Sequence, residues 1–279
     1  MTAARRVAVS ALLALARSSV APATAPAQEP PPPTLRYTAA QLDCASFLEH
    51  SRSRLDAETG GRRRRETLTR SGVLRVRALA AGDSVALEAW YDSLALSRES
   101  PEVTLRPDTD GLIGGRFRGT LSPDGRYSET TRPFVPDGVA EVADVGRTLE
   151  DLLPRLPSKP LAVGEQWTDG AGLELHRIAD STARGRPIRR LLLRSRVQTD
   201  TAAIRGDTVQ LPATEVTTEE GEVDWDAERG LLRRTRHIVT ETLVPAGGPL
   251  KLPLRSRMEQ QADLIRGARA CEGAGRESK

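Results

Sequence analysis

The sequence is poor in aromatic residues, histidine and cysteine, and this poverty excludes several kinds of site. Aromatic residues make up 3% of the 279 residues, and there are three histidines and two cysteines. No two histidines have the H-x-H or H-x-x-x-H spacing of a metal site. No G-x-S-x-G or S-x-x-K motif and no phosphate-binding glycine motif occurs. The sequence therefore predicts no cofactor and no bound metal.

The sequence also lacks any stretch of 18 apolar residues, so we expect no transmembrane helix in the mature protein. A shorter apolar run, Val7 to Ala16, follows the basic pair Arg5–Arg6 and precedes the small-x-small motif at residues 25–27. This order is that of a secretory signal peptide. We expect residues 1–27 to be a signal peptide cleaved after Ala27, so that the protein is exported to the periplasm or out of the cell. The alternative is the disordered N-terminus of a cytosolic protein.

The expected mature chain has no excess charge of either sign. The full sequence has 41 Lys+Arg and 38 Asp+Glu, but three cations (Arg5, Arg6 and Arg17) precede the cut. The mature chain therefore has 38 residues of each sign, which gives no electrostatic basis for binding nucleic acid.

A proline-rich segment separates the expected cut from the folded region. Residues 28–37 begin QEPPPPT, and consecutive prolines favour an extended spacer. Roughly 235 residues remain, which is enough for one domain with a sizeable core. We expect a single β-rich domain over residues 38–272 and a disordered tail over residues 273–279.

The two cysteines, Cys44 and Cys271, lie near the two ends of this expected domain. In an oxidising compartment an even pair of cysteines is most simply one disulfide. The chain-entropy model allows such a bond roughly 5 kcal/mol of stabilisation at most, because the loop it closes is long. A lipid anchor on Cys44 is disfavoured because no apolar run precedes it, and metal ligation is disfavoured because no other Cys or His lies at ligand spacing.

Alternation with a period of two dominates the chain after residue 50. Gly60-Gly61 and Gly82-Asp83 are turn sequences that separate such alternating segments. The pattern predicts about ten mostly antiparallel strands, and the lack of strand–helix–strand alternation argues against an α/β fold. Because a long sheet must twist and curl, we predict a mainly β (α+β) fold, with one large curved antiparallel sheet or half-barrel.

Two segments have a helical period instead. Residues 38–41 (TAAQ) match a capping box, and apolar residues follow at helical spacing up to Leu48, which predicts a short helix. Between Val139 and Leu153 apolar residues recur every three or four positions, and Pro154 ends the pattern. This second segment predicts one prominent helix packed across the concave face of the sheet.

Residues 222–243, EVDWDAERGLLRRTRHIVTETL, concentrate acids, arginines, a tryptophan and a histidine. Val223 and Trp225 share one face of a strand, and a polar turn ends at Gly230. The acids lie on the other strand face: Glu222, Asp224 and Asp226. We interpret the stretch as a β-hairpin whose tryptophan faces the core and whose acids face solvent.

Long hairpins, a helix after the first group of strands and this late D-x-E-x-G-L-L hairpin together resemble bacterial lipoprotein carriers of the LolA/LppX half-barrel type. The residues of the pattern are Trp225, Asp226, Glu228, Gly230, Leu231 and Leu232. Residues 157–167 (PSKPLAVGEQW) resemble a segment of other exported proteins with this architecture. The resemblance covers most of residues 45–268 and implies a hydrophobic cavity for a lipid or a lipoprotein acyl chain. It transfers no individual binding residue.

Three polar patterns are interpreted as structural. Asp108-Thr-Asp110-Gly111 lacks the distal ligands of a calcium loop and predicts a turn. The glycines between Gly111 and Gly119 lead into a strand, which favours close backbone packing over phosphate binding. The run Arg62 to Arg65 predicts a solvated face, with binding to acidic surface polymers as the alternative.

Two functions of different classes remain open, and the sequence favours the first. The first is a non-catalytic exported envelope protein that binds an apolar or lipid ligand, or an envelope protein partner, on the curved sheet. It predicts a cleft lined by Trp90, Phe117, Trp167 and Trp225. The second is a hydrolase acting on an envelope polymer or ester. It predicts that His176 or His237, rather than the peripheral His50, meets a carboxylate and a hydroxyl in one pocket.

Overall fold

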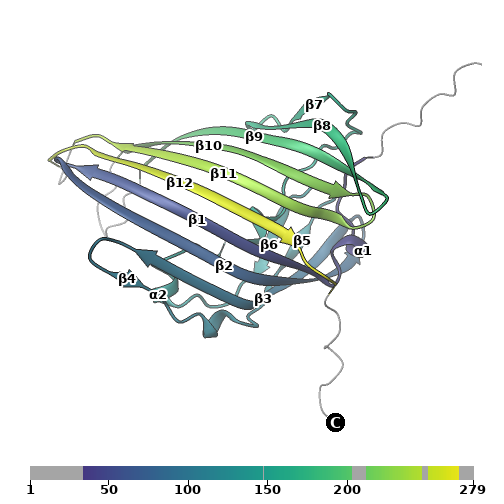
Figure 1. Cartoon of the computed structure of the whole chain (residues 1–279), viewed down its shortest axis with the longest axis horizontal. Helices are drawn as coiled ribbons and strands as arrows, with labels where there is room; N and C mark the ends of the chain where they lie inside the picture. The colour runs from purple at the N-terminus through teal and green to yellow at the C-terminus, as the bar shows by residue number, and fades with distance from the viewer. Residues whose placement is uncertain (1–33, 147, 203–211, 247–250, 270–279) are drawn as a thin grey trace, which may run out of the picture. The chain divides into compact units, whose positions relative to one another are not determined.

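The structure is a computed structural model that describes residues 34–146, 148–202, 212–246 and 251–269. The expected signal peptide, most of the proline-rich spacer, Cys271 and the expected tail lie outside these residues. Within them the chain forms a single large sheet with a few short helices (Figure 1). No helix in this part of the chain is long and apolar enough to cross a membrane.

The secondary structure elements are mostly long strands. The strands are β1 (Ala45–Thr59), β2 (Arg62–Ala81), β3 (Ser84–Glu99), β4 (Thr104–Leu105), β5 (Phe117–Leu121), β6 (Tyr127–Thr131), β7 (Gln166–Thr168), β8 (Leu173–Ala183), β9 (Arg186–Ala202), β10 (Pro212–Asp226), β11 (Gly230–Val244) and β12 (Leu254–Arg266). The helices are α1 (Ala39–Leu42), the 3-10 helix η1 (Asp110–Leu112), α2 (Asp137–Ala140) and α3 (Thr148–Leu152).

The strands pair in the order β6-β5-β3-β2-β1-β12-β11-β10-β9-β8-β7, with β4 added to β3. Every pair of neighbouring strands is antiparallel. The first half of the chain proceeds outward from β1 to the edge strand β6, and the second half returns from the other edge, β7, to β12 beside β1. The predicted fold class, a mainly β fold with one large curved antiparallel sheet, is confirmed.

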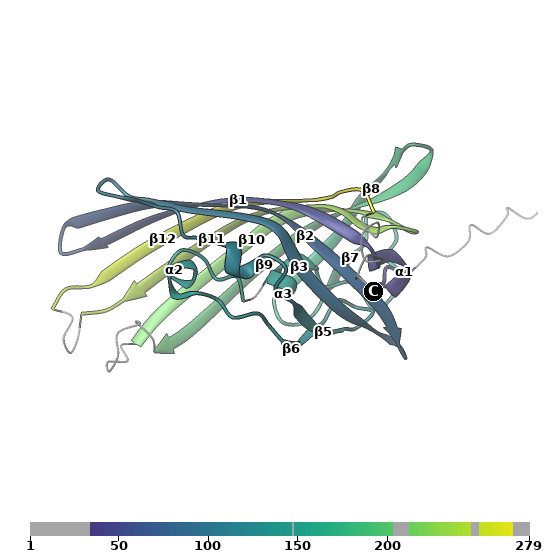
Figure 2. The same ribbon diagram turned by 90° about the horizontal axis from the view of Figure 1, so that it is seen from below.

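The connection from β6 to β7 must travel from one edge of the sheet to the other, and it does so across the concave face. Figure 2 shows α2 and α3, which belong to this connection, inside the curve of the sheet. Its apolar side chains are buried against the sheet: Val139, Val142, Val145, Leu149, Leu152, Leu153, Leu156 and Leu161. We call this connection, residues 132–165, the crossing segment. The sheet and the crossing segment together therefore form one hydrophobic core.

The crossing segment is not the single helix that the apolar spacing predicted. It contains α2 and α3, of four and five residues, joined by irregular backbone. Between them the Asp144 carboxylate accepts a hydrogen bond from the Gly146 amide at 3.0 Å, a local turn that competes with helical bonding. Glycine also disfavours a helix interior. The apolar spacing is therefore maintained by packing against the sheet rather than by one continuous helix.

The first helix is also shorter than predicted. The capping box between Thr38 and Gln41 is present, but α1 ends at Leu42. Cys44 has a φ of 58°, which turns the chain out of the helix and into β1. From there β1 pairs with both β2 and β12, so Phe47 is buried on the concave side and Leu48 is exposed on the convex side.

Two glycine interpretations are confirmed. Gly60 and Gly61 form the turn between β1 and β2 with φ values of 59° and 77°, which suit a two-residue hairpin turn of the type that requires positive φ twice. A Cβ atom at Gly119 would lie 2.3 Å from the carbonyl oxygen of Ser128, so β5 and β6 approach too closely for any side chain there.

The hairpin at residues 222–243 is also confirmed, with one correction. It is the β10–β11 pair, and Trp225 is 1% exposed. Asp226, however, is 4% exposed rather than facing solvent. Its carboxylate accepts hydrogen bonds from the backbone amides of Glu228 (2.7 Å) and Arg229 (2.9 Å), so it closes the turn, as Asp commonly does.

Buried arginines on the concave face bond the carbonyl groups of the segments that cover it. Arg177 of β8 donates to the Leu161 carbonyl, Arg266 of β12 to the Gln41 carbonyl, and Arg234 of β11 to the Asp151 carbonyl. Short helices and irregular backbone leave carbonyl groups without internal partners. These arginines satisfy such carbonyls away from water and so fix α1 and the crossing segment in place.

Trp225 belongs to the buried core, where it makes an edge-to-face contact with Tyr37 at a centroid distance of 5.0 Å. We expect Trp225→Ala to lower the free energy of unfolding by ~4 kcal/mol, because it leaves a large cavity. Trp90 is the matched control: it lies on the convex face and stacks on Arg116, so Trp90→Ala should lose only about 1 kcal/mol. Urea unfolding followed by circular dichroism measures both. Equal losses would contradict the assignment of the core.

Candidate functional site on the concave face

The two faces of the central strands differ sharply in charge. Three strands, β1, β12 and β11, present twelve uncharged residues to the concave side in their distal half, the half nearest the Gly60-Gly61 turn. We call these residues the uncharged stripe: Ser53, Leu55, Ala57 and Thr59; Leu254, Ser256, Met258 and Gln260; Ile238, Thr240, Thr242 and Val244. Their alternate neighbours on the convex side include Arg54, Asp56, Glu58, Glu241, Arg255, Arg257 and Glu259.

The uncharged stripe is less covered than the proximal half of the same strands. Phe47 and Leu264 of the proximal half belong to the buried core, whereas Leu55 and Met258 of the stripe are half-buried and lie outside the core, as far as the described residues go. At the far end Val244 packs with Ala213 and Leu254 in a small separate cluster. The crossing segment therefore fills one part of the concave face and leaves a partly exposed, uncharged part beside it.

A cluster of charged residues lies where α3 meets the sheet, next to the stripe. Arg236 of β11 donates through Nε and Nη2 to the two carboxylate oxygens of Glu219 on β10, at 2.8 and 3.1 Å. Arg234 donates through Nη2 to Glu219 at 3.0 Å. Both arginines also donate to the carbonyl oxygen of Asp151 in α3. The cluster therefore joins β10, β11 and the crossing segment.

Arg70 of β2 extends this cluster across the sheet. Its Nε lies 3.0 Å from the carboxylate of Glu49 on β1, and its Nη2 donates to the Thr148 hydroxyl at 2.9 Å and to the Tyr91 hydroxyl. The Tyr91 hydroxyl donates in turn to Glu49 at 3.1 Å. Burial raises the pKa of Tyr91, so its hydroxyl stays protonated.

Arg234 and Glu219 remain charged at neutral pH. Burial, and then the nearby Arg236, lower the pKa of Arg234 to about 10, which still leaves its guanidinium positive. Burial opposes the charged form of Glu219, but the guanidinium groups of Arg234 and Arg236 outweigh it and lower the pKa of that carboxyl. Three arginines and two glutamates, Glu49 and Glu219, lie in the interior of the cluster, and the carboxylate of Asp151 at its rim makes the numbers of positive and negative groups equal.

A cavity of about 160 Å³ lies inside this cluster. Its polar lining includes all three arginines, Thr148 and three acids (Glu49, Asp151 and Asp263), and its apolar lining includes Ile238. Ile238 and Gln260 belong both to the cavity and to the near end of the uncharged stripe. An arginine-lined cavity and an uncharged stripe are therefore continuous on one face of the sheet, an arrangement suited to a molecule with one polar and one apolar part.

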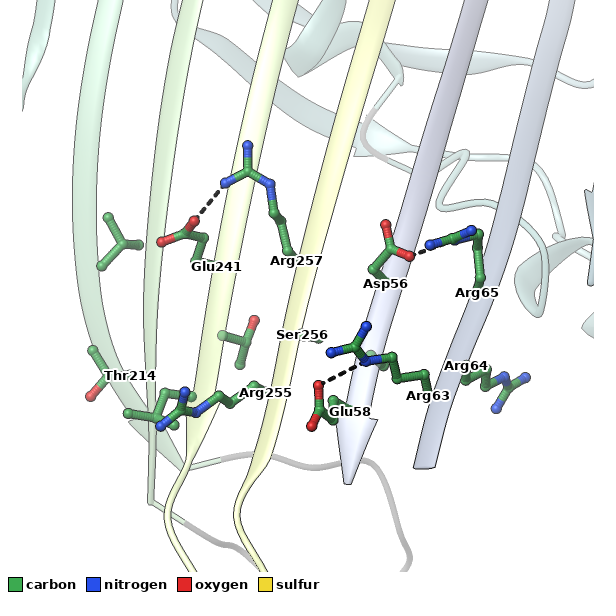
Figure 3. Close-up of a pocket in the computed structure, with 14 residues that line it drawn as sticks. Asp56, Glu58, Arg63, Arg64, Arg65, Thr214, Glu241, Arg255, Ser256 and Arg257 are labelled. Carbon is green, nitrogen blue, oxygen red and sulfur yellow. Dashed lines mark hydrogen bonds and ion pairs between the residues drawn. The ribbon is translucent and has the colours of Figure 1, made fainter. Parts of the chain in front are cut away.

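A larger groove of about 620 Å³ lies on the convex face of the distal half (Figure 3). Six of its charged side chains are paired with one another: Glu241 with Arg257 at 2.6 Å, Asp56 with Arg65 at 2.7 Å and Glu58 with Arg63 at 3.2 Å. A polar ligand would have to compete with these pairs. Arg63 and Arg65 take part in these pairs, and all four arginines of the run Arg62 to Arg65 are exposed, as predicted.

The structure does not bring the four predicted ligand-binding residues into one cleft. Phe117 and Trp225 are buried in the core, and Trp167 packs beside that core from the edge strand β7. Trp90 lies on the convex face. Its ring centroid is 3.7 Å from the guanidinium carbon of Arg116, and its Nε1–H donates to the Asp92 carboxylate at 3.2 Å. Whether any of the four contacts a ligand stays a prediction.

The histidines lie away from the concave cavity. The Nε2 of His237 is 3.0 Å from a carboxylate oxygen of Glu259 on the exposed convex face. His176 lies opposite Leu192 and Gln166, and His50 is exposed on β1. Asp108 accepts from the amide of Asp110 at 2.9 Å, which confirms a turn there. No group of three or more His, Cys, Asp or Glu residues able to hold a metal occurs within the described ranges.

Sequence reasoning missed the residues of the charged cluster, although a signal for them exists. In the stretch Leu232 to Val239, Arg234 and Arg236 are in phase with the inward-facing Ile238, whereas Arg233 is not. Charged residues at inward positions of a strand are expensive unless they are paired. Charges at such inward positions mark a candidate site. The carboxylates that complete it lie on other strands: Glu219 pairs with Arg234 and Arg236, and Glu49 pairs with Arg70.

No protein-family model and no curated protein matches the chain. Similar solved structures include a lipovitellin studied for lipid–protein interactions (11% identity, TM-score 0.46), where the match covers 82% of this chain and 25% of that one. The chain thus spans about a quarter of the lipovitellin chain. They also include a DUF1329 family protein from Desulfovibrio piger (11% identity, TM-score 0.20, 84% and 88% coverage).

A third similar structure is a domain provisionally named as an outer membrane lipoprotein-sorting protein, from Vibrio parahaemolyticus. Its identity is 9% and its TM-score 0.16, with 82% of this chain and 86% of that chain covered. The loose resemblance to lipoprotein carriers that the sequence indicated is therefore also found among solved structures. Similarities this distant assign no function, which has to be argued from the chain's own residues.

The lowered pKa of Glu219 predicts a specific pH dependence. Its ionised form stabilises the fold above its unfolded pKa of ~4.3, and this contribution is lost as the pH falls through the lower folded value. At pH 7, Glu219→Gln should lose ~3 kcal/mol because it leaves two buried arginines without their carboxylate. The loss should shrink as the pH falls below about 4.

Glu220→Gln is the matched control, because Glu220 is the next residue but faces the convex side, with its side chain 65% exposed against 13% for Glu219. This variant should change stability by less than about 0.5 kcal/mol at every pH. Thermal unfolding between pH 3 and pH 7 gives both curves. A Glu219→Gln deficit that is independent of pH would contradict the charged, arginine-paired state of Glu219.

Proposed function

We propose that this protein is an exported, non-catalytic envelope protein that binds the acyl chain of a lipid-like molecule on the uncharged stripe. The observation that supports the proposal most is the contrast between the two faces of β1, β12 and β11. The convex face carries charges that pair across strands, whereas the concave stripe carries none and is partly open. A partly exposed surface without charges, on which apolar side chains alternate with small polar ones, is suited to an apolar partner.

The dimensions and chemistry of the stripe suit an acyl chain. From Ile238 to Val244 β11 rises by six residues, or about 20 Å at ~3.4 Å per residue. Leu55, Met258 and Ile238 supply apolar side chains, and threonine methyl groups lie between them. Each methylene removed from water contributes about 0.8 kcal/mol, so even partial burial of a long chain gives useful affinity. The unbranched Met258 can adapt to chains of different shape.

Export is part of the proposal and rests on the sequence alone. The mature protein is expected to begin at Gln28 and to contain a disulfide between Cys44 and Cys271. Intact mass spectrometry of the protein secreted by a bacterial host should give the mass of residues 28–279 less two hydrogens. A non-reducing peptide map should join the two cysteine peptides. An uncleaved N-terminus, or two alkylatable thiols, would contradict this part of the proposal.

Binding is tested with fluorescently labelled palmitate and protein from which endogenous lipid has been removed. Met258→Arg places a charge in the centre of the uncharged stripe, so we expect its affinity for palmitate to fall at least tenfold. Gln261→Arg is the matched control, because Gln261 is exposed on the convex face of the same strand. Its affinity should equal that of the wild type. Equal loss in both variants, or binding unaffected by Met258→Arg, would contradict binding on the stripe.

Native mass spectrometry of the protein purified from its own envelope gives an independent test. A retained acyl lipid, lost in Met258→Arg and kept in Gln261→Arg, supports the proposal. A bare mass for all three proteins, together with no affinity for palmitate, would overturn it.

A further inference from the structure

We infer that the arginine-lined cavity beneath α3 binds an anionic headgroup, so that the ligand of the protein is an anionic amphiphile with its chain on the uncharged stripe. The inference deepens the proposed function and rests on it. It names the chemical class of the ligand and the residues that select it: Arg70, Arg234 and Arg236.

The position of the cavity supports a single ligand that occupies both regions. Ile238 of β11 and Gln260 of β12 line the cavity and are register partners at the near end of the stripe. The next stripe pair, Thr240 and Met258, lies immediately beyond them on the same two strands. A headgroup in the cavity would therefore direct its chain along the stripe without crossing a charged side chain.

The hydrogen-bond donors of the cavity are not fully used by the protein. A guanidinium group has five N–H donors, and Arg234 directs one to the Asp151 carbonyl and one to Glu219. Its Nε has no hydrogen-bond partner among the residues that the structure describes, although Arg234 is 6% exposed. Arg70 and Arg236 also line the cavity, and a guanidinium N–H that reaches the cavity can donate a charge-assisted bond to an anionic oxygen there.

The distribution of charge between the interior and the rim of the cluster favours an anion over a cationic group in the interior. In the buried interior the three arginines exceed the two glutamates by one positive charge, and solvent screens that charge poorly; the balancing carboxylate belongs to the more exposed Asp151. Asp151 lies at the rim, with its carboxylate 4.0 Å from Arg236 and half exposed. One negative headgroup would balance the charge of the interior without displacing either glutamate.

The volume of the cavity fits a small headgroup. About 160 Å³ is several times the ~30 Å³ that one water molecule occupies, enough for a carboxylate or a phosphate. A carboxylate would come from a fatty acid, and a phosphate from a lysophospholipid or from free phosphate. Arginine recognises both oxyanions through the same planar geometry. The experiment therefore has to distinguish these sources.

The test compares four probes on the lipid-free protein: labelled palmitate, palmitoyl lysophosphatidic acid, the neutral alcohol hexadecanol and inorganic phosphate. We expect the wild type to bind at least one anionic amphiphile about tenfold or more tightly than hexadecanol. Arg236→Gln should remove most of that preference and leave hexadecanol binding unchanged. Arg236→Lys, which keeps the charge but loses the planar geometry, should retain part of it.

Arg257→Gln is the matched control, because Arg257 is an arginine on the convex face paired with Glu241. It should leave every affinity unchanged. Circular dichroism and thermal unfolding verify that each variant is folded. If Arg236→Gln does not fold, two other measurements test the headgroup inference: the affinities of Arg236→Lys and the salt dependence of palmitate binding to the wild type. An ionic headgroup contact should weaken as the salt concentration rises.

The outcomes separate the two levels of the proposal. Equal affinity for palmitate, lysophosphatidic acid and hexadecanol, unchanged in Arg236→Gln, would overturn the headgroup inference and leave acyl-chain binding intact. No affinity for any of the three amphiphiles would overturn the proposed function and the inference together. Binding of inorganic phosphate alone, sensitive to Arg236→Gln, would overturn the amphiphile assignment in favour of a free-anion site.

Discussion

The structure depends on one topological constraint: the chain has to cross the concave face of its own sheet. The strands proceed outward to β6 and resume at β7, the opposite edge, so the segment between them must pass over the sheet. That segment buries its apolar side chains and carries irregular backbone whose carbonyl groups need partners. Arginines projecting from the sheet supply those partners, as Arg177 does for Leu161 and Arg234 for Asp151. The burial of its leucine and valine side chains and the hydrogen bonds from arginines together hold the crossing segment in place.

The crossing segment also divides the concave face into two environments. Where the segment lies, the sheet forms a closed core around Trp225 and Phe47. Beyond it, the same strands present an uncharged and partly open stripe. The charged cluster of Arg70, Arg234, Arg236 and their glutamates lies at the boundary. The boundary thus combines a structural role, fixing α3, with guanidinium groups that line a cavity. A fold built this way places an arginine-lined cavity and an uncharged surface side by side.

The sequence predicted the sheet well because alternation and turn chemistry are local. Gly60-Gly61 specifies a tight turn, and the residues on either side pair in the register that the turn dictates. The helices were predicted less well. Apolar spacing between Val139 and Leu153 indicated which side chains face the core, but not that Asp144 and Gly146 would interrupt the helix. The sequence wrongly predicted that Asp226 faces solvent. A side chain that bonds the amides of a turn occupies the same position in the alternating pattern as one that faces solvent, so the pattern cannot distinguish them.

The sequence by itself determined the class of fold, the antiparallel hairpins and which residues of each strand face inward, because these follow from two-residue periodicity and from turn residues. Tertiary structure decided which inward residues meet. Arg70, Arg234 and Glu219 are far apart in sequence and on separate strands, and only the order of strands in the sheet places them around one cavity. It also decided that Trp90 lies on the convex face, away from Trp225. Alternation gives each strand two faces, but pairing across the sheet assigns those faces to the core, to solvent or to a site.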